Sequence, residues 1–254
     1  MASLLQDYAP LSSVNKEEVE NEVTNLMDNS MKYCREDSSY ASQPMYQFRM
    51  ASINHRLASL FHSTVRGDCS EQKKRHLRQL SEKHYQRALK LYLQMECHME
   101  YLRAQLEYIA LLERSLTGQS SSRNLKVLHQ MLQSLADCQE PLKGLSSQLK
   151  DTDGPTNHQN EGETIVNIIE ERLQFILQQL VKINTHLHSK KSASRQNSTM
   201  LAELKVLYAN SLSIDTSDKV LNKLQSKCAF LETFLQQVSN FCHKIGSNQE
   251  SEVT

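Results

Sequence analysis

The longest uninterrupted apolar pattern, between residues 70 and 116, most limits what this chain can fold into. Its apolar residues recur at steps of three and four, and no glycine or proline interrupts them. This spacing lines one face of an α-helix, whereas a half-buried strand requires alternation at every second residue. We expect either one very long helix or two helices joined by an almost straight connection. The stripe comprises Leu77, His84, Ala88, Leu91, Met95, His98, Leu102, Ile109, Leu112 and Leu116.

Shorter segments with the same spacing occupy most of the remaining sequence. The chain has only six glycines and four prolines, which favours helices over a fold rich in strands and turns. We therefore predict an all-α fold, a helical bundle or solenoid with long helices. The other expected helices cover about residues 15–34, 42–66, 123–138, 141–149, 163–189, 199–212 and 216–245.

A polar stretch divides the pattern into two parts. Residues 150–162 contain Gly154, Pro155 and Gly162 but no apolar side chain able to anchor them, which is typical of a flexible linker. We expect a helical domain at 15–149 and a three-helix segment at 163–246. Residues 1–14 are expected to fray, and residues 247–254 to form a disordered tail.

The charges of the chain are balanced, with 29 Lys and Arg against 29 Asp and Glu. No bulk positive field therefore attracts nucleic acid, and no apolar run approaches the length of a membrane span. The six cysteines are scattered singly along the sequence, which is typical of reduced thiols that pack among other side chains. We expect partners that are other proteins, with no direct nucleic-acid contact and no membrane. The oligomeric state stays open.

The sequence contains no motif that predicts catalysis. A glycine-rich phosphate loop, a G-x-S-x-G turn and a His-Glu-x-x-His run are all absent. Cys97-His98, Cys242-His243 and His186-x-His188 lack the paired spacing that one zinc ion needs. We predict that the chain is not an enzyme and that it binds no cofactor and no metal. The alternative from another class of function is a helical metal-dependent hydrolase. Ser198, after Arg195, resembles a basophilic phosphorylation site, an interpretation that the sequence leaves open.

Two motifs resemble the two helices of a tetratricopeptide repeat, one at residues 54–61 and the other at 81–88. Small residues at the contact allow antiparallel helices to approach closely, and large ones fill the remaining space. The match is degenerate because Asn54 replaces the opening aromatic residue, extra residues separate the halves, and Leu93 stands where proline is usual. We expect this hairpin within about residues 44–116. Its expected packing residues are Leu57, Ala58, Phe61, Ser81, Tyr85 and Ala88.

Residues 47–114, including the run His84-Tyr85-Gln86-Arg87-Ala88 and Leu89-Lys90-Leu91-Tyr92, also resemble the C-terminal region of the erythroid differentiation-related factor family. That resemblance implies a scaffold or adaptor in the nucleus, linked to transcription of erythroid and globin genes. The alternative is a cytoplasmic adaptor or a coiled-coil assembly subunit. The chain could also be a fragment or isoform of a longer protein.

The tetratricopeptide resemblance further implies that the first helix of the hairpin lines a groove for a partner. The groove lacks the Lys and Asn residues that grip an acidic peptide terminus, so chaperone-tail binding is not expected. An ordinary solvated helix face is the alternative interpretation. The candidate groove residues are Ser52, His55, Ser59, His62 and Ser63.

Overall fold

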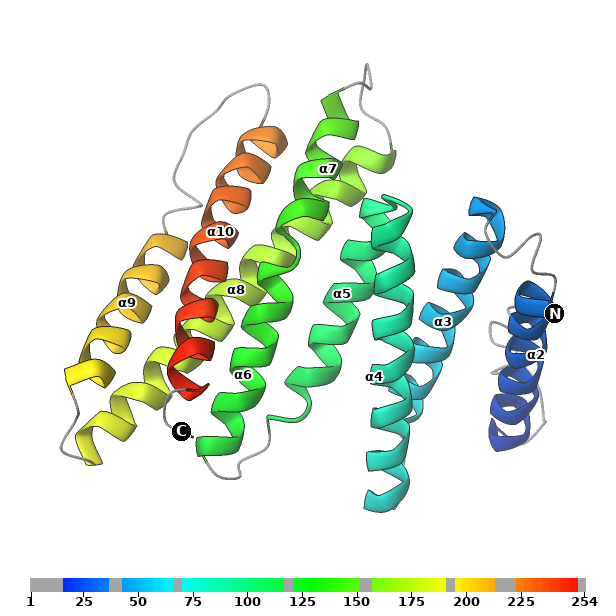
Figure 1. The fold of residues 1–254 in the computed structure, drawn as a ribbon, viewed down its shortest axis with the longest axis horizontal. Helices are drawn as coiled ribbons and strands as arrows, with labels where there is room; N and C mark the ends of the chain where they lie inside the picture. The colour runs from blue at the N-terminus through cyan, green and yellow to red at the C-terminus, as the bar shows by residue number, and fades with distance from the viewer. Residues whose placement is uncertain are drawn as a thin grey trace. The chain divides into compact units, whose positions relative to one another are not determined.

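The computed structural model describes residues 16–36, 43–65, 70–116, 121–150, 157–190, 195–212 and 223–250, and nearly all of them are helical (Figure 1). No strand occurs in these ranges, and the predicted all-α class is confirmed. The helices are α2 (Lys16–Glu36), α3 (Pro44–Val65), α4 (Glu71–Gln94), α5 (His98–Glu113), α6 (Ser121–Ala136), α7 (Gln139–Lys150), α8 (Asn157–Lys190), α9 (Arg195–Ser211) and α10 (Lys223–Glu250).

The chain divides into two compact units, residues 1–104 and 105–254. In the first unit α3 packs most extensively against α4, and α2 packs against α3. One apolar cluster joins α2 to α3, as the helical spacing of its members requires. It consists of Val19, Val23, Met27 and Met31 from α2 with Leu57 and Leu60 from α3, and Met50, Ile53 and Phe61 pack against it.

The long pattern between residues 70 and 116 is broken into two helices by a tight turn at residues 95–97. Glu96 adopts a left-handed backbone conformation with φ 56°. The Cys97 amide donates to the Tyr92 carbonyl at 3.0 Å, and the Glu96 amide donates to the Leu93 carbonyl at 3.2 Å. These two bonds form a Schellman motif, which ends a helix by turning the chain at a left-handed residue. The expectation of one very long helix is wrong, because the structure contains two helices. The alternative of an almost straight connection is also wrong, because this tight turn joins them.

In the second unit α8 lies at the centre of the packing. It contacts α6, α9 and α10, while α10 also packs on α6 and α7. The face of α8 that these helices cover is mostly apolar over its middle turns, with the buried Glu170 as an exception, and its large apolar side chains are nearly inaccessible to solvent. Those residues are Ile165, Val166, Ile169, Leu173, Ile176, Leu177 and Leu180.

Polar contacts at the edges of this core tie distant segments together. Ion pairs join Arg172 to Glu113 and Lys227 to the buried Glu170. From α5, Gln105 donates from Nε2 to the Ser134 carbonyl on α6 at 2.7 Å. The second unit therefore includes residues from α5 as well as from the segments on both sides of residue 150.

The structure differs from the expected linker and tail. Residues 157–162 form the first turns of α8, and Gly162 is buried there. A polar, proline-free segment can extend a helix whose later turns are anchored by an apolar stripe, which explains the difference. At the other end, α10 continues past Gly246 to Glu250. The expected frayed N-terminus at 1–14 and the residues 151–156 and 251–254 lie outside the described residues.

The two expected helices on either side of residue 213 have different bounds in the structure. Helix α9 begins at Arg195, before the expected start at Thr199. Polar residues can extend a helix whose later turns are anchored by an apolar stripe. Helix α10 is described from Lys223, so the expected start at Thr216 lies outside the described residues.

Candidate functional site

Small residues are buried where α3 packs against α4. Ala58, Ser81 and Ala88 are fully buried. The Ser81 hydroxyl donates to the Ala58 carbonyl at 2.8 Å across the two helices. A bond from a side chain of one helix to the backbone of another requires the two backbones to lie close together, which small residues permit.

The large residues expected in the hairpin lie around this contact, and two of them, Leu57 and Phe61, also contact the apolar cluster shared with α2. Tyr85 is fully buried and its hydroxyl lies 3.4 Å from His62 Nδ1. The half-buried Phe61 ring lies against His84, with 5.7 Å between ring centroids. Leu57 is also buried, and it belongs to the apolar cluster between α2 and α3.

A buried polar pair occupies the position where tetratricopeptide repeats have their first aromatic residue. Asn54 is 1% exposed, and its Oδ1 lies 2.9 Å from His84 Nδ1. The Asn54 amide nitrogen donates to the Met50 carbonyl at 2.7 Å, so Oδ1 accepts and His84 Nδ1 carries the proton. Burial is the main cause that lowers the pKa of His84, reinforced by Arg87 and Lys83 and opposed by Asp28. This imidazole is therefore held neutral as a structural donor.

The five residues expected to line a partner groove do not share one exposed face. Ser63 is exposed and donates to the Leu60 carbonyl, whereas His62 is only 5% exposed. His55 lies against the rings of Tyr85 and Tyr92. Ser52 and Ser59 are half-buried. The two histidines thus pack toward α4, and a groove for this set stays a prediction.

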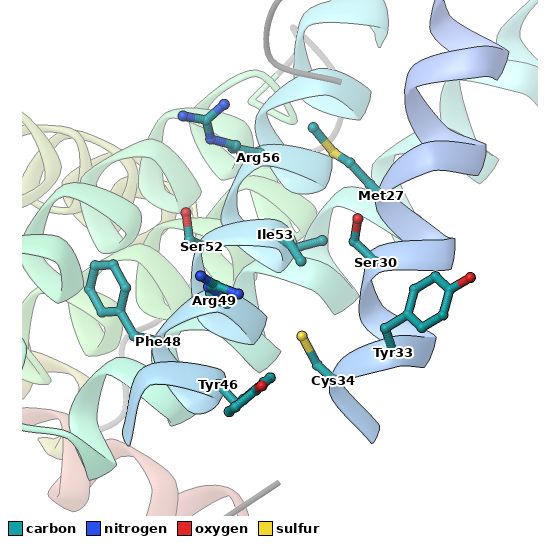
Figure 2. Close-up of a pocket in the computed structure, with 10 residues that line it drawn as sticks. All are labelled: Met27, Ser30, Tyr33, Cys34, Tyr46, Phe48, Arg49, Ser52, Ile53 and Arg56. Atoms are coloured by element: carbon teal, nitrogen blue, oxygen red, sulfur yellow. The ribbon is translucent and has the colours of Figure 1, made fainter. Parts of the chain in front are cut away.

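A different depression, which we call the α2–α3 groove, lies between the first two described helices (Figure 2). Its cavity volume is about 490 Å³. Helix α2 contributes Met27, Ser30, Tyr33 and Cys34. Helix α3 contributes Tyr46, Phe48, Arg49, Ser52, Ile53 and Arg56.

The groove combines an apolar floor with positive charge on one side. Figure 2 shows Met27, Cys34 and Ile53 between the helices, and Arg49 and Arg56 on the α3 side. Met27 and Cys34 are buried, whereas both arginines are exposed. The Arg49 guanidinium carbon lies 5.9 Å from the centroid of the Tyr46 ring, a cation–π contact that limits where this charge can move. Arginine, tyrosine and methionine are enriched in protein interfaces.

The sequence interpretation did not single out this groove. Two signals for it were present, since Arg49 and Arg56 stand seven residues apart on one helix and Tyr46 stands one turn before Arg49. Residues seven apart lie on the same helix face. The missing information was which other helix covers that face.

Cys228 and Cys242 are poor nucleophiles. Burial raises the pKa of the Cys228 thiol to about 11 and that of the Cys242 thiol to about 12. A thiol with such a pKa is almost wholly protonated at neutral pH, whereas the thiolate is the reactive form. Among the described residues, no group of three or more His, Cys, Asp or Glu could hold a metal ion.

Two further features are the apolar character of the helices and the exposure of Ser198. None of the helices in the described ranges combines the length and the apolar character needed to cross a bilayer. Ser198 is exposed in the first turn of α9, where a hydroxyl is sterically open to modification. Neither feature identifies a partner.

A comparison with protein families matches residues 1–241 to the family described as Erythroid differentiation-related factor 1-like, TPR repeats. Three curated relatives are each named Erythroid differentiation-related factor 1. They come from Homo sapiens (33% identical, covering 97% of this chain and 20% of the relative), Pongo abelii (32%, 97% and 21%) and Mus musculus (32%, 91% and 20%). The chain thus spans about a fifth of the length of these relatives. No solved structure matches it significantly.

Proposed function

Because the chain belongs to the Erythroid differentiation-related factor 1-like family of tetratricopeptide-repeat proteins, we propose that it is a protein-interaction scaffold that acts in the nucleus in transcription regulation. Tetratricopeptide repeats stack helical hairpins into surfaces that bind other proteins. The names of the relatives support a role in erythroid differentiation. The nuclear setting is supported by the family resemblance alone.

The observation that carries this proposal is the close contact between α3 and α4. Ala58, Ser81 and Ala88 are fully buried, and the Ser81 hydroxyl bonds to the backbone of the facing helix. This is the packing that a tetratricopeptide hairpin requires, and the family match extends over it. A hairpin of this kind supplies a rigid helical surface for partners rather than a cavity for a small substrate.

Affinity purification from erythroid nuclear extract tests the scaffold proposal. The tagged full chain is compared with Ala88→Glu, which disrupts the hairpin, and with Gln86→Glu, which changes an exposed position on the same helix. We expect a reproducible set of partners with the unchanged chain and with Gln86→Glu, and loss of that set with Ala88→Glu. Recovery of no protein above the tag-only control would contradict the proposal.

Localisation is tested separately by imaging the tagged endogenous protein. We expect nuclear signal in erythroid cells. A purely cytoplasmic signal together with reproducible partners would favour a cytoplasmic adaptor instead.

A further inference from the structure

The two positive charges of the α2–α3 groove lie on one face of α3. Arg49 and Arg56 are the only charged side chains among the ten described residues that line it. They stand seven residues apart on α3, about 10.5 Å along its axis at 1.5 Å per residue. Two carboxylates seven residues apart on a partner helix have the same separation, so each could face one guanidinium.

The apolar floor lies between these charges. Ile53 is one turn from Arg49 on α3, and Met27 faces it from α2. A large apolar side chain placed midway between the two acids of a partner helix would reach this floor. Methionine side chains adapt to such an anchor because they are unbranched and polarisable.

We propose that the α2–α3 groove binds an amphipathic helix of a partner protein, with two acidic residues seven positions apart and a large apolar residue between them. The inference rests on the proposed scaffold function and assigns its partner chemistry and surface. A helix lying along a groove between two helices uses the same packing that joins helices within a domain.

A nucleic acid fits these observations less well than an acidic helix. Binding to a phosphate backbone depends on many basic contacts along a track, whereas this groove supplies two arginines. The balanced charge of the whole chain adds no long-range attraction for a polyanion.

The test uses the purified full chain and fluorescent synthetic helical peptides, measured by fluorescence anisotropy. One peptide carries two Glu seven residues apart with Leu three and four residues after the first, and matched peptides carry Gln or Lys in place of Glu. We expect the Glu peptide to bind more tightly than the Gln peptide, and the Lys peptide to bind least.

Variants of the chain identify the surface. Arg49→Glu combined with Arg56→Glu should weaken binding of the Glu peptide by about tenfold or more, since two attractions become repulsions. The same double variant should bind the Lys peptide more tightly than the unchanged chain does. The matched control is Arg75→Glu with Arg87→Glu, two exposed positions on α4 outside the groove, which should leave the Glu peptide's affinity within about twofold.

Four binding results would overturn the proposal, and a fifth result concerns self-association. These are absence of Glu-peptide binding at the highest soluble concentration, equal affinity for the Glu and Gln peptides, equal loss of binding in the control variant, and tighter groove-dependent binding of a single-stranded oligonucleotide. Self-association through the groove would also overturn it. In that case the molecular mass measured in solution without peptide would be lower for the Arg49 and Arg56 variant than for the unchanged chain.

The outcome is separable from that of the scaffold proposal. If the unchanged chain recovers partners from nuclear extract and the groove variant recovers the same set, the groove assignment fails while the scaffold function stands. If the unchanged chain recovers no partner, the scaffold function fails whatever the peptides do.

Discussion

At the scale of single residues, Ala88 is one of the small side chains that the hairpin buries completely. The residue is fully buried in α4, whereas Gln86 on the same helix is exposed. Ala88→Glu introduces a larger side chain and a charge into this space and should lower the free energy of unfolding by roughly 3 kcal/mol or more. Gln86→Glu should change it by no more than about 0.5 kcal/mol. Equal denaturation midpoints for the two variants would contradict this packing.

Glu96 stores conformational strain at the end of α4. Its φ of 56° lies in the left-handed region, which costs most L-residues about 1–2 kcal/mol but costs glycine almost nothing. Glu96→Gly should therefore raise the free energy of unfolding by about 0.5–1 kcal/mol, measured by urea denaturation. The control Gln86→Gly, in the helix interior, should lower it by about 1 kcal/mol. A loss of stability in Glu96→Gly would show that the turn depends on the glutamate side chain.

The buried imidazole of His84 makes the stability of the first unit depend on pH. Burial lowers the pKa of His84 from its ordinary value of 6.5, so below that pH the unfolded chain binds a proton that the folded protein resists. The stability that neutral His84 contributes is present above about pH 6.5 and is lost as the pH falls toward the lowered pKa.

We therefore expect melting temperature to fall from pH 7 to about pH 5, with a shallower fall in His84→Gln. Some of the fall should remain in that variant, because burial also lowers the pKa of His129. His76→Gln, at an exposed position of α4, is the control and should keep the full slope. Identical slopes for the unchanged chain and His84→Gln would contradict the structural role of the neutral imidazole.

The spacing of small and apolar residues predicted which faces of α3 and α4 meet. It did not predict how the polar side chains on those faces pair. Asn54 was recognised as a departure from the repeat pattern, and its partner His84 stands thirty residues further along the chain. No local spacing indicates such a pair, because it depends on the crossing of two helices. For the same reason the repeat resemblance places His55 and His62 in the lining of a partner groove, whereas the structure packs both side chains toward α4.

At the scale of elements, α2 is held mainly by one apolar stripe against α3. Val23 lies within that stripe and is 1% exposed. Val23→Asp buries an unpaired carboxylate there and should release α2 while the contact between α3 and α4 remains.

Hydrogen exchange measured by mass spectrometry checks this expectation. In Val23→Asp, peptides from α2 should exchange at close to the unfolded rate, and peptides from α4 should keep their protection. Asn25→Asp, at an exposed position of α2, should leave both patterns unchanged. Equal loss of protection in α2 and α4 would mean that the three helices open as one unit.

Helix positions followed from apolar spacing, but the turn at residues 95–97 did not. Met95, Glu96 and Cys97 continue a helical pattern, and none of them is a glycine, proline or asparagine that would indicate a stop. The turn exists because backbone bonds to Tyr92 and Leu93 offset the strain at Glu96, and those bonds leave no trace in composition.

At the scale of the whole molecule, the sequence predicts a linker between two parts at residues 150–162, whereas the structure packs the helices on both sides of it together. The second unit spans residues 105–254, and α7 packs on α10 while α6 packs on both α8 and α10. Helices on both sides of residue 150 thus share one core. A polar stretch indicates where the chain is exposed, but it does not indicate whether the flanking helices separate.

Limited trypsin digestion distinguishes a loop within one core from a linker between domains. Lys150 ends α7, and we expect cleavage after it to be the first cut. The two fragments should remain associated, because Gln139 on α7 donates to Gln236 on α10 and the buried faces of α6, α8 and α10 lie against one another. Size-exclusion chromatography should show a peak at the uncut volume, with two bands on a denaturing gel. Lys150→Gln should suppress the cut, and separation of the fragments without denaturant would instead support two independent domains.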